Sequence, residues 1–356
     1  MTHVFTKDPT WLKKWDDFIS KTPRGNHLLL SDWLNSYTTY GFDFELCIFL
    51  EDETIIGGYG AVIAKALFFK FYIVPHGPVF SKGFEKEIPS CLDLLKQRAK
   101  KHNCCYTQFS LPISSHPSIQ EHVYHPTKVA VPESQFRAGK LFDHVYCSYG
   151  INWIDFNDCN TSEEFINQLP AKTRRNIRLA YRLEVENTLV TYESELKAGY
   201  SIVEANALQG NYALRSYEDI KAQLLSLMSK DKGYFMILRH DNQIKGASFS
   251  IQAGNYITNI FGGTKKGKPD IKAGYVLHWE WILKSFELGF SGYNISMGGS
   301  KGVREFKAHF GAQEIFYETP HYYRILNPFI FKFYKKSYGI LKNNKTFISG
   351  ILKRFK

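Results

Sequence analysis

Two long stretches of the sequence alternate between hydrophobic and polar residues in the same way. Residues 45–64, ELCIFLEDETIIGGYGAVIA, and residues 234–253, YFMILRHDNQIKGASFSIQA, each hold an apolar run, a short polar turn and a second alternating run. Four identities align at a single offset of 189 positions: Asp52 with Asp241, Ile55 with Ile244, Gly57 with Gly246 and Ala64 with Ala253. Alternation broken by a short polar turn predicts a β-hairpin. Each stretch is therefore expected to form one.

The elements that follow each hairpin also repeat in order. A strand-like run (68–80 and 255–263), an amphipathic helix (85–102 and 273–289) and a further strand (105–111 and 293–298) come after each hairpin. A repeated order of elements indicates two copies of one supersecondary unit. The predicted fold class is therefore α+β, with two mostly antiparallel sheets flanked by helices.

The length also favours two domains, because 356 residues exceed what one hydrophobic core usually fills. Residues 112–160 between the copies read as loops and short strands, and NWIDFND (152–158) begins a new strand. We expect a first domain over 1–150, a second over 151–326 and a basic aromatic tail over 327–356.

The charge is concentrated at the C-terminal end. The formal net charge is +11, but the last acidic residue is Glu318, and nine basic residues follow it. Residues 1–318 therefore carry only about +2. A basic end suits an anionic partner, either RNA or an anionic membrane face. The tail mixes Phe, Ile, Leu and Lys as a membrane-surface helix does, but a helix docked on the body with its lysines in solvent fits equally well.

The cysteines and the N-terminus indicate a cytoplasmic location. The six cysteines are scattered without a CxxC pair, as expected of reduced thiols. The N-terminus lacks the apolar core of a signal peptide, and no stretch reaches the roughly 18 uninterrupted apolar residues of a spanning helix. The protein is expected to be soluble or peripheral at the inner membrane face.

A basic helix is predicted over residues 169–184, LPAKTRRNIRLAYRLE, after a helix start at TSEEF (161–165). On a helical wheel one arc is basic and the opposite arc is expected to be packed. The basic arc holds Lys172, Arg174, Arg175, Arg178 and Arg182, and the packed arc holds Ile177, Ala180, Tyr181 and Leu183. An ordinary solvated face is the alternative, but the absence of interleaved acids favours phosphate binding.

Several familiar motifs are absent or incomplete. GGTKKGK (262–268) has the spacing of a phosphate loop, but Pro269 replaces the magnesium-binding Ser or Thr, so a basic loop between strand and helix is expected. HLLLSD (27–32) has an HxxxxD spacing that is common by chance, and Ser31 there is a predicted helix N-cap. No metal, serine nucleophile or dinucleotide site is expected. His278 and His309 are candidate bases, although a lone helical histidine is more often structural.

The segment GVREFKAHFG (302–311) places a lysine beside an apolar helix face. Val303, Phe306 and Phe310 share that face, Gly311 stands where a C-cap glycine would be, and Lys307 lies at the border. A lysine there either extends its amine from a core helix into solvent or holds a fixed charge in a low-dielectric site.

These motifs resemble, in order, those of the FemABX-type aminoacyltransferases, which build peptidoglycan interpeptide bridges on two tandem GNAT-fold domains. The matching segments are HLLLSDWLNSY (27–37), PHGPVF (75–80), LPAKTRRNIRLA (169–180) and GGSKGVREFKAHFGAQEIFYE (298–318). The chain resembles the compact members that lack a coiled-coil arm. The early lysine that helps to hold the acceptor phosphates in a compact member has no match, since Asn35 and Ser36 stand in that region.

The resemblance implies transfer of an amino acid from aminoacyl-tRNA to an amine of a peptidoglycan precursor peptide, either nucleotide- or lipid-linked. Lys307 would stabilise the oxyanion and the leaving ribose oxygen, an effect typically of about 3–4 kcal/mol, and Phe306 would shape its pocket. Lys172, Arg175 and Arg178 are expected to bind phosphates, Arg215 and Tyr217 the acceptor, and Arg304 the substrate. No cofactor is expected, because residues 265–277 lack the Q/RxxGxG/A loop of CoA-dependent relatives.

Two alternatives stay open. One is an acyltransferase of the same fold that modifies a surface polysaccharide or nucleotide-sugar with another activated acyl donor. The other is a non-catalytic RNA- or membrane-binding protein on a degenerate GNAT scaffold.

Overall fold

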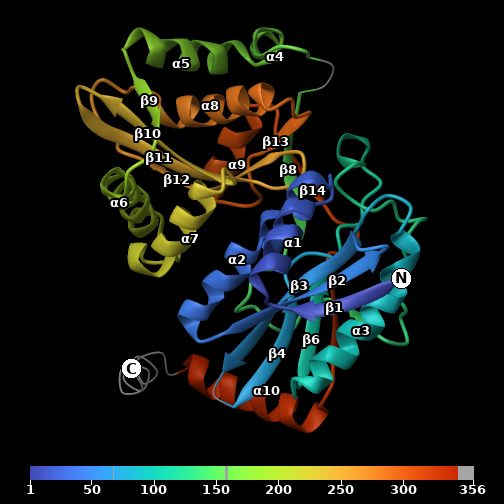
Figure 1. Cartoon of the computed structure of the whole chain (residues 1–356). Helices are drawn as coiled ribbons and strands as arrows, with labels where there is room; N and C mark the ends of the chain where they lie inside the picture. Colours follow the sequence, from blue (N-terminus) through green and yellow to red (C-terminus); the bar gives the residue numbers. More distant parts are fainter. Residues whose placement is uncertain (67, 157–158, 344–356) are drawn as a thin grey trace.

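A computed structural model describes residues 1–66, 68–156 and 159–343, which form two mixed β-sheets, one for each half of the chain (Figure 1). The first sheet has the order β1-β2-β3-β4-β6-β15-β7, with β5 paired to β3, and the second has the order β14-β8-β13-β12-β11-β10-β9. The strands of the first sheet are β1 (Thr2–Thr6), β2 (Asp43–Glu51), β3 (Thr54–Ala66), β4 (Phe69–Val74), β5 (Val79–Phe80), β6 (Tyr106–Ser110), β7 (Arg137–Ala138) and β15 (His321–Ile325). Those of the second sheet are β8 (Gly150–Asp155), β9 (Glu186–Leu189), β10 (Gly233–His240), β11 (Gln243–Gln252), β12 (Ile257–Thr264), β13 (Gly292–Asn294) and β14 (Gln313–Phe316).

The internal repeat predicted from the hydrophobic pattern is confirmed. Strands β2 and β3 form one hairpin and β10 and β11 the other. The register shifts between Phe49 and Leu50 in the first hairpin and between Leu238 and Arg239 in the second, which is the same 189-residue offset. In each copy the strand after the hairpin pairs in parallel with the strand after the helix, β4 with β6 and β12 with β13. The predicted α+β class with two tandem GNAT-like units is confirmed.

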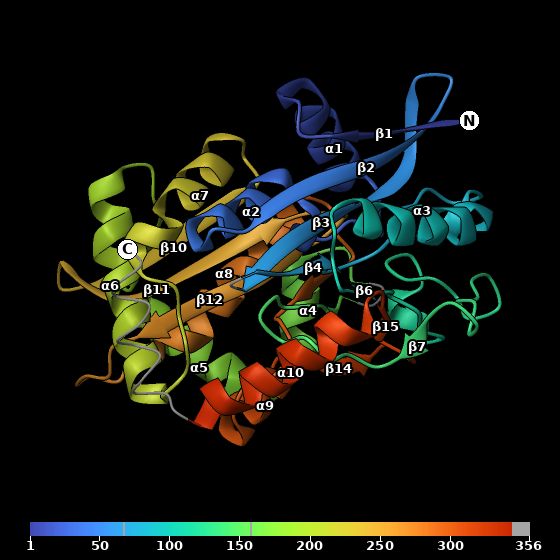
Figure 2. The ribbon, with the colours of Figure 1, turned by 90° about the horizontal axis from the view of Figure 1, so that it is seen from below.

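Helices cover both faces of both sheets, as the alternation of side chains along each strand requires. In the first half, α1 (Pro9–Lys21), α2 (Ser31–Asn35) and α10 (Pro328–Asn343) lie on one side and α3 (Ile88–Lys101) on the other (Figure 2). In the second half, α5 (Ala171–Arg182) and α8 (Ala273–Glu287) cover one face, and α6 (Glu193–Gly210) and α7 (Tyr217–Ser229) the other. Two shorter helices, α4 (Ser162–Gln168) and α9 (Lys301–Ala308), complete the second half.

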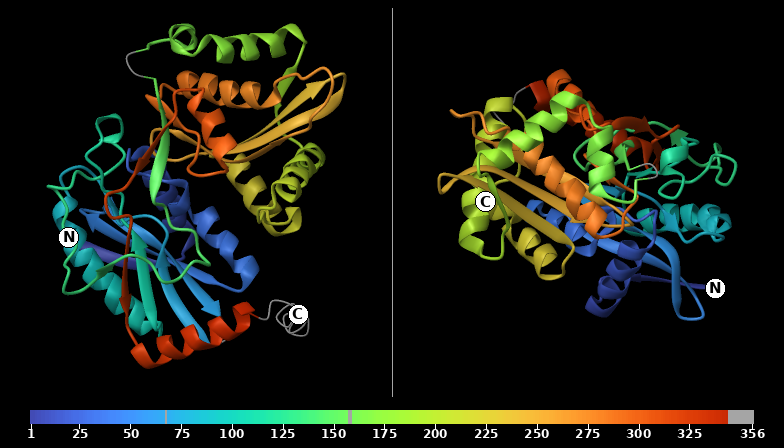
Figure 3. Two further views of the ribbon diagram at one scale, coloured as in Figure 1. Left: turned by 180° about the vertical axis from the view of Figure 1, so that it is seen from behind. Right: turned by 90° about the horizontal axis from the view of Figure 1, so that it is seen from above.

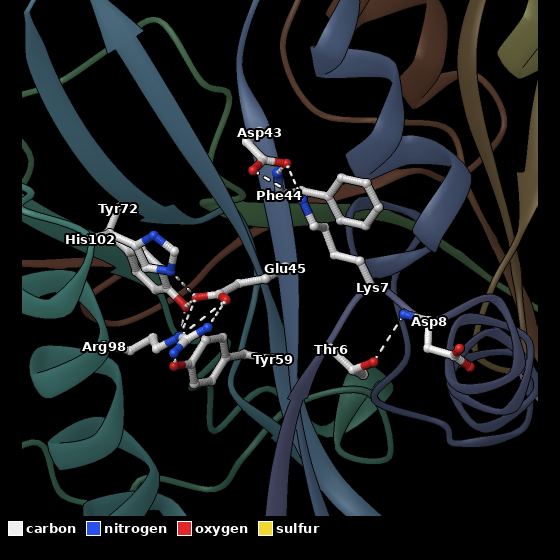
Figure 4. Close-up of polar contacts among 10 residues, drawn as sticks. All are labelled: Thr6, Lys7, Asp8, Asp43, Phe44, Glu45, Tyr59, Tyr72, Arg98 and His102. Carbon is white, nitrogen blue, oxygen red and sulfur yellow. Dashed lines mark hydrogen bonds and ion pairs between the residues drawn. The ribbon is translucent and has the colours of Figure 1, made fainter.

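A buried carboxylate attaches α3 to the first sheet. Glu45 on β2 is almost fully buried and accepts hydrogen bonds from Arg98 Nε and Nη2 (2.9 and 2.6 Å), from the Tyr72 hydroxyl (2.8 Å) and from the His102 ring (2.9 Å), all drawn in Figure 4. The bidentate Arg98 pair neutralises the charge and satisfies the remaining lone pairs, which a buried carboxylate needs.

The chain returns to the first sheet at its end. Strand β14 closes the edge of the second sheet beside β8, whereas β15, five residues after β14, pairs with β6 and β7 of the first sheet. Strand β1 and helix α10 therefore lie in the same half (Figure 3). The expected second-domain range of 151–326 thus includes a strand that belongs to the first sheet, and β14 and β15 do not form the closing hairpin of one GNAT unit.

The two halves are in direct contact through buried side chains. One continuous hydrophobic cluster includes Trp15 and Leu34 of the first half and Leu224 and Phe249 of the second. Polar contacts reinforce it: Asp32 accepts hydrogen bonds from Ser226 of α7 (2.9 Å) and from Lys230 directly after that helix (2.6 Å). The two halves therefore meet at a packed interface, which we call the seam, and a site can form along it.

Some local expectations are corrected. Ser31 does not cap α2, because its hydroxyl donates to the buried carboxylate of Asp16 at 2.6 Å, and Leu30 occupies the cap position. The predicted helix start at TSEEF holds, with the Thr161 hydroxyl accepting from the Glu164 amide. Within the described part of the chain, no helix is long and apolar enough to cross a bilayer.

Candidate active site between the two halves

The second sheet opens where β12 and β13 stop pairing. Their parallel ladder holds only two residue pairs, Ile257 with Tyr293 and Thr258 with Asn294. A cavity of about 260 Å³ lies at this point. It is lined by Asn26, His27, Leu28 and Trp33 of the first half, by Tyr146, Ser148 and Gly150 of the connection, and by Thr258, Asn259, Ile260, Asn294, Ser296 and Met297 of the second half. We call it the cleft cavity.

The cleft cavity is polar but carries no formal charge among its lining residues. His27 Nδ1 and Trp33 Nε1 are buried there without a hydrogen-bond partner among the described residues. Their rings meet edge to face at a centroid distance of 4.8 Å. Burial lowers the pKa of His27 to about 3, so the imidazole is neutral at physiological pH. Buried polar atoms without partners are uncommon.

Lys307 lies behind the loop that lines this cavity. The Lys307 ammonium donates to the carbonyl oxygens of Ser296 (2.8 Å) and Gly298 (3.0 Å). The loop can present both carbonyls to one ammonium because its backbone is left-handed at Ser296 (φ 68°), Gly298 (75°) and Gly299 (110°). Helix α9 begins directly after this loop, with the Ser300 hydroxyl as its N-cap.

The structure buries Lys307 more deeply than the sequence pattern suggests. Its side chain is only 7% exposed, while Val303, expected on the packed face, is exposed. The two loop carbonyls account for this orientation, because they draw the ammonium inward and turn Val303 to solvent. Burial lowers the pKa of Lys307 to about 8, and the carboxylate of Glu314 partly opposes that shift. Gly311 has the positive φ (80°) expected of a glycine that ends the turn after α9.

Phe306 forms part of a second cavity, which we call the lysine cavity. Its volume is about 270 Å³, and five lysines line it against two aspartates: Lys245, Lys265, Lys266, Lys268 and Lys272 with Asp241 and Asp270. The Phe306 ring packs edge to face on Tyr275 at 5.0 Å and lies so close to Gly274 that a Cβ there would meet the ring at 3.4 Å. Helix α8 begins in this cavity without a side-chain cap. The Tyr275 and Val276 amides bond the Lys272 carbonyl, so the amides of Ala273 and Gly274 are the ones that could bind an anion. The sequence predicted a basic loop here but gave no sign that it faces Phe306.

The basic helix α5 is attached to the segment that carries Lys307. The Thr173 hydroxyl donates to the carbonyl of His309 at 3.0 Å. Arg175, Arg178 and Arg182 are exposed and line a surface hollow of about 610 Å³, and Lys172 is exposed outside that hollow. Arg174 lines this hollow too, and its guanidinium donates to the carbonyls of Asn167 and Leu169 at the end of α4. One member of the predicted packed arc is corrected: Tyr181 is exposed and donates to Glu280.

Arg215 lies at the seam between the halves, within an aromatic group. Its Nη1 donates to the Ser36 hydroxyl at 2.7 Å, and its guanidinium lies 5.0 Å from the Tyr37 ring centre, 5.3 Å from that of Tyr40 and 5.9 Å from that of Trp33. Trp33 also lines the cleft cavity, so Arg215 borders its wall. These contacts are compatible with cation–π attraction.

The other predicted site residues lie elsewhere. Tyr217 is buried against Tyr200, and its hydroxyl has no partner among the described residues. Arg304 is exposed, with its Nη1 3.6 Å from Glu314. Neither residue lines the cleft or the lysine cavity.

The two candidate histidines are engaged in internal contacts. His278 is buried and pairs with the Tyr293 hydroxyl at 3.1 Å, and burial lowers its pKa to about 3. His309 pairs with the Tyr275 hydroxyl at 3.1 Å. His27 and Trp33 were not predicted as site residues; the only signal was their place in HLLLSDWLNSY (27–37). No cluster that could hold a metal ion occurs among the described residues.

Comparisons with known proteins place this arrangement among GNAT folds. Residues 170–308 match the family model of the acetyltransferase (GNAT) domain. The crystal structure of FemX superposes with a TM-score of 0.76 at 12% identity, covering 94% of this chain and 99% of that one. A comparison with curated protein sequences found no match.

Two further solved structures share the tandem arrangement. The C-terminal domain of a putative lysylphosphatidylglycerol synthetase from Agrobacterium fabrum matches with a TM-score of 0.54 at 13% identity over 93% of this chain and 96% of that one. A tandem GNAT protein from the clavulanic acid biosynthesis pathway matches with a TM-score of 0.51 at 11% identity over 92% and 99%. Residues 170–308 thus match a GNAT domain, and the whole chain shares its fold with FemX and with a tandem GNAT protein.

Proposed function

We propose that this protein transfers an amino acid from aminoacyl-tRNA to an amine of a peptidoglycan precursor peptide. The observation that carries the proposal is the position of two adjacent residues. Phe306 forms part of the lysine cavity, and Lys307 binds the loop that lines the cleft cavity. An anionic donor and a neutral acceptor would therefore meet at this pair.

The lysine cavity suits the phosphates of a tRNA 3′ end. Five lysines outnumber two aspartates there, and Asp270 is already paired with Lys272. The uncapped start of α8 adds backbone donors on the same side. The exposed arginines of α5 extend the basic surface, and Arg is well suited to bidentate phosphate contacts. A tRNA longer than the cavity would continue along Arg175 and Arg178.

The chemistry that we propose for Lys307 uses its remaining hydrogen-bond donor. The acceptor nitrogen attacks the ester carbonyl, an oxyanion forms, and the ribose oxygen leaves as the new amide bond remains. A protonated lysine has three N–H donors, and the described contacts use two of them. The third N–H can stabilise the oxyanion or give a proton to the leaving ribose oxygen. The acceptor nitrogen, which becomes positively charged when it attacks, then returns a proton to the lysine. Phe306 beside it keeps water from the ester.

The cleft cavity suits an uncharged peptide acceptor. Because its lining holds no carboxylate, an incoming amine would not be held as an ammonium ion and would more readily be the neutral nucleophile. The Trp33 indole N–H and the His27 ring would offer hydrogen bonds to peptide groups. Arg215 at the wall is placed for a phosphate of a nucleotide- or lipid-linked precursor, in a region where Asn35 and Ser36 supply no cation.

The proteins with similar solved structures also support this proposal. FemX shares the whole fold, and a putative lysylphosphatidylglycerol synthetase shares it at a lower TM-score. A lipid-linked acceptor would bring the enzyme to the inner membrane face, where the basic C-terminal end is expected to contact anionic lipid.

A transfer assay tests the proposal. Purified protein is given a mixture of charged tRNAs or, separately, a mixture of acyl-CoAs, with nucleotide-linked and lipid-linked muropeptides as acceptors. Aminoacylated muropeptide is expected only with charged tRNA, and RNase treatment of the donor should abolish it. Product that forms from acyl-CoA and survives RNase would overturn the tRNA assignment.

A second candidate is an acyltransferase of the same fold that uses another activated donor on a polysaccharide or nucleotide-sugar. The acetyltransferase description of the domain over 170–308 favours it, and the lysine cavity could equally bind the phosphates of an acyl-CoA. The acyl-CoA arm of the same assay, with nucleotide-sugar acceptors added, distinguishes the two.

A further inference from the structure

Helix α10 packs against the core of the first half through one face. Phe331 and Tyr334 are buried. The Phe331 ring stacks on Tyr106 at 5.0 Å, and the Tyr334 ring meets Phe71 at 4.7 Å. These contacts join the helix to β4 and β6, so its orientation is defined over its first two turns.

The opposite face of α10 combines exposed phenylalanines with lysines. Phe329, Lys332, Phe333 and Lys336 have the spacing i, i+3, i+4, i+7, which puts them on one side of a helix. Phe329 is 88% exposed and Phe333 is 54% exposed, and both lysines are exposed. Soluble proteins seldom expose clustered large apolar side chains without a binding role.

A second element enlarges this surface. Phe68, at the turn between β3 and β4, is 67% exposed, and its ring stacks on that of Phe333 at 6.1 Å. Lys65 and Lys70 face each other across the same hairpin. We call the set Phe68, Phe329, Ile330, Lys332, Phe333, Lys335 and Lys336 the Phe–Lys surface. It is built from segments more than 250 residues apart, so its apolar exposure is not an accident of one frayed helix.

We infer that the Phe–Lys surface docks onto the interface of an anionic lipid bilayer. Its apolar side chains can enter the boundary between headgroups and acyl chains while the lysines stay at the level of the lipid phosphates. The sequence holds no acidic residue after Glu318, so the charge of this end matches an anionic leaflet. Ile330 favours lipid over RNA, because an aliphatic side chain cannot stack on a base, and α10 contains no arginine.

This inference deepens the proposed function, since a lipid-linked acceptor is reached at a membrane, but it is measured separately. Vesicle binding needs no substrate, and transfer to a nucleotide-linked muropeptide needs no vesicle. Failure of one experiment therefore leaves the other unaffected.

The test is co-sedimentation of the full-length, RNase-treated protein with vesicles of equal parts phosphatidylglycerol and phosphatidylcholine, compared with vesicles of phosphatidylcholine alone. We expect binding to the anionic vesicles and much weaker binding to the neutral ones. F329S/F333S and K332E/K336E should each weaken binding by about tenfold or more. L208S is the matched control, because Leu208 on α6 is 82% exposed and belongs to the other half; it should bind like the wild type.

The single variant F329S and the charge-reversal variant separate loss of membrane binding from loss of folding. F329S alone is included because Phe329 has the greatest exposure on this surface, so that its loss should not disturb folding, which thermal melting checks. Equal vesicle binding by the wild type, F329S and K332E/K336E would overturn the inference. So would vesicle binding that is lost on RNase treatment, or a Phe–Lys surface whose substitution weakens tRNA binding and leaves vesicle binding unchanged.

Discussion

Lys307 is an ammonium held in a largely buried position by neutral partners. Its hydrogen-bond acceptors among the described residues are two backbone carbonyls, and the carboxylate of Glu314 raises its pKa less than burial lowers it. Carbonyl dipoles hold a charge without neutralising it. The positive charge of such a residue can therefore stabilise a negatively charged transition state. Burial also makes the residue lose its proton more easily than an exposed lysine does.

The first prediction concerns the pH dependence of transfer. Lys307 is protonated below its pKa of about 8 and neutral above it. If the ammonium is the active form, kcat should fall as pH rises past about 8. In K307R the guanidinium stays charged, so that fall should vanish, although the rate is lower throughout because the fit changes. Deprotonation of the acceptor amine would raise kcat with increasing pH, and that rise is the same in the wild type and in K307R.

The K307A variant measures how much Lys307 contributes to kcat. Loss of one oxyanion donor costs about 3–4 kcal/mol, or roughly 10² to 10³ in kcat. A kcat for K307A within a few-fold of the wild type, in a protein whose melting temperature is unchanged, would leave Lys307 with only its role of holding the loop.

At this scale the sequence singled out Phe306 and Lys307, whose roles stay predictions. The burial of Lys307 could not be foreseen, because its acceptors belong to a loop whose left-handed residues are Ser296, Gly298 and Gly299. His27 and Trp33 were missed for a similar reason. Their partners in the cavity come from strands more than 200 residues later, and no local pattern records that distance.

Among the elements, α3 depends on one buried ion pair. Glu45 accepts from Arg98, Tyr72 and His102 in a site away from solvent. E45A should lower the free energy of unfolding by about 3–5 kcal/mol, because Arg98 is left largely buried and unpaired. E45Q, which keeps the shape and can still accept from Tyr72, should lose less. Chemical denaturation measures both, and equal losses would show that shape rather than charge holds α3.

The loop before α8 gives a prediction about the donor. Replacing Lys265, Lys266 and Lys268 with Gln should raise the KM for charged tRNA several-fold and reduce its dependence on salt, since phosphate contacts release counterions. The expected kcat at saturating donor is close to the wild-type value. Gln at Lys100 and Lys101 of α3, which are exposed in the other half, is the control. If both sets raised the KM equally, net charge rather than this loop would bind the donor.

The elements themselves were largely predictable. Period-two alternation gave both hairpins, and the identity of Asp52 with Asp241 reflects turns that follow bulges at equivalent positions. Failures occurred where tertiary contacts compete with local preference. Ser31 does not cap α2 because its hydroxyl bonds Asp16, and Tyr181 is exposed because its hydroxyl bonds Glu280. Residues 344–356 of the predicted tail lie outside the described part of the chain.

On the scale of the whole molecule, the final segment of the chain completes the first sheet. A protein that ends after Glu318 lacks β15 and α10, which exposes Tyr106 and Phe71 and leaves one edge of β6 unpaired. We expect it to aggregate or to lose cooperative thermal unfolding, whereas a protein that ends after Asn343 should melt cooperatively. A soluble, cooperative 1–318 protein would contradict the importance of this return strand.

This return could not be read from the sequence. Residues 313–325, QEIFYETPHYYRI, resemble two strands joined by a short turn, which is the signature of a hairpin. The two strands instead join different sheets, because each sheet offers an unsatisfied edge, at β8 for β14 and at β6 for β15. Only the position of both edges in space decides this pairing.

The pairing of β15 with β6 also determines when the first sheet can be completed during synthesis. The ribosome releases β6 about 210 residues before the strand that pairs with it, so the N-terminal half must wait with an open edge until translation is nearly finished. An unprotected edge invites pairing with other chains. The newborn protein should therefore depend on chaperones during that interval, and a premature stop codon late in the message would damage the half that was made first.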